Sequence, residues 1–222
     1  MKKALISTAA VLAVSATAMV APAQSANAQV MKPGTTSLAE VLASDGSSFD
    51  KNWNDFDILE AAVTAVLAND KKSAVAVLAD GKTRLTAFAP TDKAFKKLAQ
   101  DLSGKKFTTE KKVTTWLAKN AGIDTIETVL LYHVVPGKTL GSGKVVKADG
   151  AKLTTAQGGT VTVKVSGSGK NTAVTLVDQD PNAKDAQVIV LDINKGNPQI
   201  AHAINRVTID ITSKPPGTIE WE

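Results

Sequence analysis

Apolar residues in the first half of the chain recur at the three- and four-residue spacing of amphipathic helices. A short helix is expected over 37–41. A longer one begins near Asp57, whose residue type caps helices, and has Glu60 at its third position. Another helix is expected over 73–78. This part of the chain therefore contributes helices that bury one face.

The same spacing continues after Pro90. Thr91 is placed to cap a helix in which Phe95 begins an apolar face, and lysines occupy the opposite face. A following helix over 110–120 ends at Gly122, and Asp124 opens the next one. The helical pattern stops before residue 136.

Strand patterns frame and follow these helices. The segment 83–89 reads as a strand, which Pro90 ends because proline cannot donate to a ladder. Beyond residue 137 apolar and polar residues alternate, as at Val161 and Val163, and 166–171 reads as a flexible hairpin loop. Further strands are expected over 173–177, 187–191 and 200–211. Helices first and strands afterwards predict an α+β fold with a mixed or antiparallel sheet.

The N-terminus has the pattern of an export signal. Lys2 and Lys3 precede an apolar stretch, and small residues lead to Ala28, after which cleavage is expected. Serines and threonines interrupt the stretch, so it is too polar for a transmembrane anchor of about 20 apolar residues. Residues 1–28 are therefore assigned to a signal peptide and the protein to the extracellular space.

Charge and cysteine content exclude several classes of function. The formal net charge is +5, and loss of residues 1–28 would reduce it to +3. So small a charge, with lysines scattered among acids, does not form the basic footprint that nucleic acids require. The chain has no cysteine, which excludes disulfides, thiolate catalysis and cysteine-bound zinc.

Three sequence blocks resemble the fasciclin (FAS1) domain family. They occur in the family's order, starting with Thr86-Ala87-Phe88-Ala89-Pro90-Thr91-Asp92-Lys93-Ala94-Phe95. The second is Leu131-Tyr132-His133-Val134-Val135-Pro136-Gly137, and the third is Gln199-Ile200-Ala201-His202-Ala203-Ile204-Asn205-Arg206-Val207. Asn205 stands where the family more often has an aspartate, which argues against a role that needs a charge there.

This resemblance implies a wedge-like β-sandwich of mixed and antiparallel strands with the helical N-terminal half packed against it. It covers 55–211 as a single domain, with 29–54 as an arm that carries a short helix and 212–222 as a tail. The family-motif residues are expected to act structurally: Thr86, Phe88, Pro90, Thr91, Asp92, Phe95, Tyr132, His133, Pro136, Gly137 and His202.

His133 could be structural or catalytic. It follows Ile126, Val129 and Leu130 on one helix-spaced row, which predicts a buried imidazole. Thr91 and Asp92 are the expected hydrogen-bond partners. A hydrolytic triad of Thr91 or Ser142 with His133 and Asp92 would lack a nucleophile elbow, and a capping threonine has its hydroxyl committed. A structural histidine is the better interpretation, and no catalytic residue is assigned.

Metal and phosphate sites have little support in the sequence. Only His133 and His202 could join zinc, which leaves it short of ligands. Asp178 and Asp180 begin like a calcium loop but lack its glycine and its final glutamate, so a polar turn is favoured over a weak cation site. The glycine-rich stretch 141–144 reads as a flexible turn rather than a phosphate loop. No cofactor is expected.

The resemblance and the export signal together predict a secreted, monomeric, non-enzymatic adhesion or interaction module. Its partner would be an extracellular or cell-envelope protein or polysaccharide. The alternative is a carrier of a small apolar ligand, such as a lipid or pigment, in a groove between helices and sheet. Trp53, Phe56 and Trp221 are candidates for the interaction surface, although Trp53 and Phe56 could instead pack the arm onto the domain.

Overall fold

The computed structural model describes residues 34–46, 48–181 and 183–209, so the expected signal peptide, the tail and Trp221 lie outside the described residues. The helices are α1 (Leu38–Leu42), η1 (Ala43–Asp45), α2 (Asp57–Asn69), η2 (Ala74–Ala79), α3 (Asp92–Ser103), α4 (Glu110–Ala121), α5 (Ile123–Tyr132), α6 (Ser142–Val145) and η3 (Gly169–Asn171). The strands are β1 (Leu85–Pro90), β2 (Val134–Pro136), β3 (Lys152–Thr154), β4 (Thr160–Ser166), β5 (Ala173–Val177), β6 (Ala186–Ile193) and β7 (Gln199–Ile204). The three η segments are 3₁₀ helices.

All seven strands belong to one mixed sheet in the order β2-β1-β7-β6-β5-β4-β3. Strands β1 and β7, about 110 residues apart in the chain, pair in parallel, and the other neighbours pair antiparallel. Both of these parallel strands are buried along their whole length, as expected for strands covered on both faces. The α+β class is consistent with this topology, but the expected sandwich of two packed sheets is not confirmed.

The sheet curves until its two ends nearly meet. The chain just beyond β3 hydrogen-bonds back to β2, where the N–H of Ala156 donates to the carbonyl oxygen of Val134 at 2.7 Å. The edge of β2 is thereby partly covered, which protects it from pairing with other chains.

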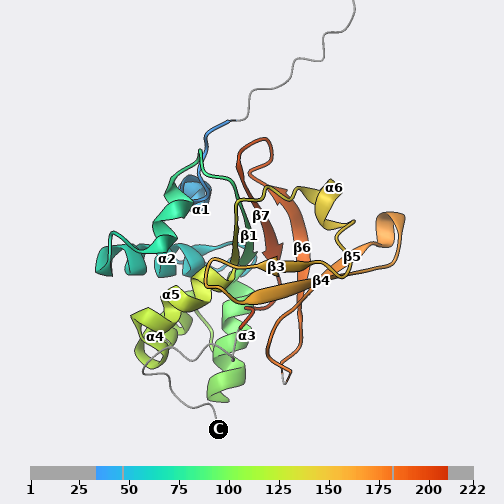
Figure 1. The fold of residues 1–222 in the computed structure, drawn as a ribbon. Helices are drawn as coiled ribbons and strands as arrows, with labels where there is room; N and C mark the ends of the chain where they lie inside the picture. The colour runs from blue at the N-terminus through green and yellow to red at the C-terminus, as the bar shows by residue number, and fades with distance from the viewer. Residues whose placement is uncertain (1–33, 47, 182, 210–222) are drawn as a thin grey trace, which may run out of the picture. The chain divides into compact units, whose positions relative to one another are not determined.

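Two apolar clusters form the core, one on each side of β1 and β7. Alternate residues of β1 point to opposite faces, so Leu85 and Ala87 join the cluster shared with the helices. Phe88 joins the cluster enclosed by the curved sheet, together with Tyr132 and Leu176. Figure 1 shows α2, α4 and α5 on one side of the sheet, where they cover the first cluster.

Two details of helix capping differ from the expectation. The N–H of Ile58 in the first turn of α2 donates to Oδ1 of Asp92 at 2.9 Å, so a distant residue caps the helix that Asp57 was expected to cap. Thr91 does occupy the N-cap position of α3, but its hydroxyl makes no capping hydrogen bond. Contrary to expectation, the Thr91 hydroxyl is therefore not committed to capping.

The second half also contains features that alternation does not indicate. Strand β7 ends at Ile204, whereas a strand to residue 211 was expected. Strands β2 and β3 have three residues each, too few for a visible period. Residues 142–145, expected as a flexible turn, form helix α6. Across the described part of the chain, helices are too short or too polar to cross a membrane.

Candidate functional site

His133 is buried at the C-terminal end of α5, as its place on the apolar row predicted. Its Nδ1 donates to the carbonyl oxygen of Val129 at 2.7 Å, which fixes the neutral tautomer. Its Nε2 accepts from the N–H and the hydroxyl of Thr208, each at 3.0 Å. The prediction that Thr91 and Asp92 are its hydrogen-bond partners is therefore wrong. Burial lowers the pKa of His133 to about 4, so the ring is uncharged at neutral pH.

His202 on β7 is also completely buried and has a partner at each nitrogen. Its Nε2 donates to the carbonyl oxygen of Leu140 at 2.7 Å, and its Nδ1 accepts from the N–H of Asp192 at 3.2 Å. Burial lowers the pKa of this imidazole. Since both ring nitrogens of each histidine are engaged, neither ring is poised to bind zinc or transfer a proton in this conformation.

Thr86 joins β1 to the loop after β2. Its hydroxyl donates to the carbonyl oxygen of Lys138 at 2.7 Å and accepts from the N–H of Leu140 at 2.9 Å. Gly137 begins this loop with a positive φ of 74°, a conformation that favours glycine. All three family-like blocks thus meet around one loop, since its Leu140 also accepts a hydrogen bond from His202.

The remaining motif residues pack or terminate elements. Phe95 lies in the helix-side cluster, and Tyr132 donates its hydroxyl to the carbonyl oxygen of Thr160 at 2.8 Å. Pro90 and Pro136 are the last residues of β1 and β2. These placements are compatible with a structural role, which stays a prediction for these residues.

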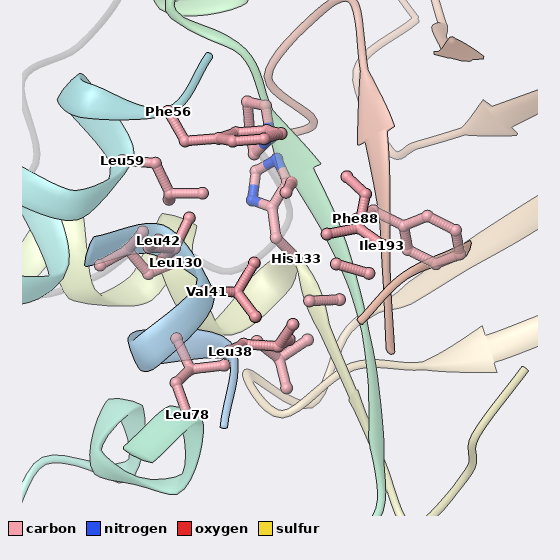
Figure 2. A pocket seen from close by; sticks show the side chains of 15 residues that line it. Leu38, Val41, Leu42, Phe56, Leu59, Leu78, Phe88, Leu130, His133 and Ile193 are labelled. Atoms are coloured by element: carbon pink, nitrogen blue, oxygen red, sulfur yellow. The ribbon is translucent and has the colours of Figure 1, made fainter. Parts of the chain in front are cut away.

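The two described aromatics proposed for the surface, Trp53 and Phe56, are half-buried against the helix-side cluster. The ammonium of Lys96 lies 3.9 Å from the centroid of the Trp53 ring. Phe56 lines a pocket beside His133, which Figure 2 shows from close by. The packing role that was weighed against surface binding therefore has structural support, and a role in partner binding stays a prediction.

Two apolar cavities lie next to the helices. The one in Figure 2, between helices and sheet, measures about 40 Å³ and includes Leu38, Leu59 and Ala201 in its lining. A second, among α2, α3, α4 and α5, measures about 100 Å³. Pockets for drug-sized ligands measure roughly 300–1,000 Å³, so neither cavity holds a lipid or a pigment without opening.

Asp178, the residue considered for a weak cation site, has both carboxylate oxygens occupied by backbone amides. Its Oδ2 accepts from the N–H of Ile209 at 2.9 Å and its Oδ1 from the N–H of Asp180 at 3.0 Å. Burial raises the pKa of Asp178. This aspartate ties the segment after β7 to the β5–β6 connection, and its geometry gives no support to a cation site.

The glycine-rich stretch at 141–144 is held by an acid. Asp192 accepts from the N–H and the hydroxyl of Ser142 at the start of α6, both at 2.6 Å, and pairs with Lys195 at 2.9 Å. Although burial opposes it, these hydrogen bonds lower the pKa of Asp192 to about 2. A carboxylate therefore occupies the place that a phosphate would need.

Sequence reasoning missed a group of three acids, two of them buried, near the beginnings of α2, α3 and α4. One carboxylate oxygen each from Asp55, Asp92 and Glu110 lies within 4.8 Å of the other two. Asp92 and Glu110 are completely buried. Burial and the neighbouring Asp55 raise the pKa of Asp92 to about 8, and burial raises that of Glu110. The three residues are far apart in the chain, so no local motif could have shown that they meet.

Sequence reasoning also missed an apolar strip on β6. Ile189, Val190 and Leu191 are 50%, 51% and 39% exposed. Strand β6 pairs with β5 only at Gln187 and Ala186, and its register with β7 is shifted on both sides of Val190. The shifts turn successive apolar side chains outward. An apolar run usually predicts burial, so this exposed surface could not be recognised from the sequence.

Comparison with known proteins links this geometry to a family. The sequence model of the Fasciclin domain matches residues 59–210, more than half of the chain. A solved structure of a FAS1 domain pair from the insect cell adhesion molecule Fasciclin I superposes with a TM-score of 0.54 at 18% identity. The match covers 80% of this chain and 52% of the insect chain. At that identity the likeness concerns the fold.

Two curated proteins share only short segments with the chain. The GMP synthase [glutamine-hydrolyzing] of Spiroplasma kunkelii is 86% identical over 21 residues, which are 10% of this chain and 4% of that protein. The enzyme of the same name from Thermobifida fusca (strain YX) is 95% identical over 19 residues, 9% of this chain and 4% of that protein. The chain thus spans a very small part of both relatives, and these segments carry no functional argument.

Proposed function

Because this chain belongs to the Fasciclin domain family, we propose that it works outside the cell as a non-enzymatic interaction module. The insect structure of the same fold comes from a cell adhesion molecule, which is consistent with such a role. The engagement of both imidazoles argues against acid–base catalysis by either histidine.

Export is the first part of this proposal. Two lysines, an apolar stretch and small residues up to Ala28 support a cleavable signal. When the full-length chain is expressed in a secreting host, the protein in the medium should begin at Gln29. Retention of an uncleaved chain with the cells would contradict secretion.

The apolar strip of Ile189, Val190 and Leu191 is the observation that carries the interaction role. Isolated exposed apolar residues are common, but here three successive residues of one strand are exposed together. Strand β6 has one edge unpaired beyond Gln187, so a partner could contact both its main chain and its side chains. We therefore assign this surface to a protein partner.

Saturable binding to cell-envelope and matrix fractions tests the assignment. The variant Val190→Lys places a charge in the middle of the strip and should weaken binding at least about tenfold, because desolvating a charge opposes association. Ala173→Lys, at another exposed strand position, is the matched control and should bind like the wild type. Equal binding by all three proteins would remove the strip from the proposal, and no saturable wild-type binding would overturn the interaction role.

A carrier role for a small apolar ligand is the second candidate, supported by the two apolar cavities. Their volumes of about 40 and 100 Å³ require the helices to move before a lipid or pigment can enter. Native mass spectrometry of unheated protein, after exposure to lipid and pigment extracts, should then detect a bound mass. Detection of protein alone would exclude this role.

A further inference from the structure

Three carboxylates converge from separate parts of the chain. Asp55 precedes α2, while Asp92 and Glu110 are the first residues of α3 and α4. One oxygen from each lies within 4.8 Å of the others. Two oxygens bound to one Ca²⁺ at 2.3–2.6 Å are at most about 5 Å apart, so the observed spacing allows a shared ion.

Glu110 is the strongest sign of a ligand. Its side chain is completely buried, and neither Oε1 nor Oε2 has a hydrogen-bond partner of ordinary geometry, although the main chain of Asp50 lies near enough to oppose the rise in its pKa. Asp92 uses Oδ1 to cap α2, while its Oδ2 has no N–H or hydroxyl partner, and its contact with the Asp55 carboxyl helps to raise its pKa. A buried carboxylate without hydrogen bonds is costly unless something else compensates its charge.

Protein cations do not supply that compensation. Among the residues that the structure describes, no lysine or arginine forms an ion pair with Asp55, Asp92 or Glu110. The positive ends of α3 and α4 reduce the electrostatic cost, but each carries only about half an elementary charge. At neutral pH a bound proton or a bound cation must therefore offset the charge that these three acids would otherwise carry together.

We propose that Asp55, Asp92 and Glu110 form a binding site for a divalent cation of the calcium type. All three contribute oxygen, the ligand atom of hard cations, and the group contains no histidine or cysteine that would favour zinc or copper. Ca²⁺ tolerates irregular geometry better than Mg²⁺, which suits ligands from three separate segments. Asp55 also belongs to a second group with Asp50 and Asp57, so further oxygens lie close by.

The ion would join the beginnings of three helices. Asp92 already links α3 to α2 through Ile58, and its main-chain N–H donates to the carbonyl oxygen of Asp55 at 3.1 Å. Binding would add Glu110 and hence α4 to this junction. The cation would stabilise the folded domain, since it binds the assembled site and not the separate segments.

The test uses the full chain, stripped with a chelator and titrated with Ca²⁺ and separately with Mg²⁺ by isothermal titration calorimetry at neutral pH. One saturable Ca²⁺ site with a dissociation constant at or below about 1 mM is expected. Thermal unfolding in Ca²⁺ rather than chelator should raise Tm by at least about 2 °C.

Three variants locate the site. Glu110→Gln and Asp55→Asn should each weaken Ca²⁺ binding roughly tenfold or more and abolish the Tm increase, since each removes a ligand charge. Asp55→Asn provides the same information if Glu110→Gln does not fold. Asp124→Asn is the control because Asp124 lies in the first turn of α5, is exposed and is outside the group.

Two results would overturn the proposed site, and a third would overturn its assignment to calcium. The first is no saturable heat with Ca²⁺ together with the same Tm in chelator and in Ca²⁺, which would mean that protons compensate the carboxylates. The second is Ca²⁺ binding that both cluster variants retain at wild-type affinity, which would place the ion elsewhere. Tighter binding of Mg²⁺ than of Ca²⁺ would contradict the calcium assignment.

Discussion

Thr208 donates two hydrogen bonds to one atom of His133, which lies 75 residues earlier in the chain. The main-chain N–H and the hydroxyl both reach Nε2 at 3.0 Å. The segment after β7 is therefore fastened to the end of α5 by an imidazole that must stay neutral, because a protonated Nε2 could not accept these bonds.

His133 should make folding stability depend on pH. Its pKa is about 4 in the folded protein and near 6.5 in an unfolded chain, so the unfolded state binds the proton more readily. The stabilisation is complete above about pH 6.5 and is lost as the pH falls toward 4, a change of roughly 3 kcal/mol. Urea unfolding across this pH range should show that wild type has a larger free energy of unfolding than His133→Gln, and that this difference decreases at low pH. Parallel stability curves would show that the imidazole does not titrate as described.

Removal of the Thr86 hydroxyl should destabilise the domain. Thr86→Val keeps the side-chain shape but leaves the carbonyl oxygen of Lys138 and the N–H of Leu140 without this partner. The expected loss is about 1–3 kcal/mol in the free energy of urea unfolding. Thr128→Val removes a partly exposed hydroxyl on α5 and should cost less than about 1 kcal/mol. Equal losses of unfolding free energy in the two variants would show that the hydrogen bonds of Thr86 contribute no more to stability than that of a partly exposed hydroxyl.

Gly81 should not tolerate a side chain. A Cβ atom there would lie 1.8 Å from the carbonyl oxygen of Thr35, so the arm before α1 would have to move. Gly81→Ala is expected to reduce the free energy of unfolding by about 1–3 kcal/mol, the usual cost of overpacking. Such a loss corresponds to a decrease of several degrees in Tm. Gly143 in α6 is the control, because a Cβ atom added there would meet no other atom within 4 Å. Gly143→Ala should therefore leave Tm unchanged or raise it slightly. A Tm for Gly81→Ala like that of the wild type would show that the arm adjusts freely.

Gln199 should hold the arm on the domain. Its Oε1 accepts from the N–H of Leu38 at 2.8 Å, and its Nε2 donates to the carbonyl oxygens of Val77 and Asp80. In Gln199→Leu these buried groups lose their partner, so α1 should open more often. Hydrogen exchange at 38–42 should speed up more than exchange in β4. Unchanged exchange in α1 would contradict this anchoring.

The family-like blocks and the periodic patterns determined much of the local structure. The spacing of apolar residues located α2, α4 and α5, and alternation located β4 and β5, because each element must bury one face. Apolar periodicity and helix-stop residues are both local signals, which depend only on residues close together in the sequence. The predicted positions of these elements therefore agree with the structure to within a few residues.

The tertiary structure alone decided which polar groups meet. The sequence indicated a buried imidazole at His133, but Thr208 rather than Thr91 became its partner. Likewise, the chain order says nothing of Asp55 and Glu110 lying together, or of β6 turning Val190 outward. Local periodicity indicates which face of a helix or strand is buried. Hydrogen-bond partners and charge clusters depend instead on contacts between distant segments, which exist only once the sheet has curved and the helices have packed on it.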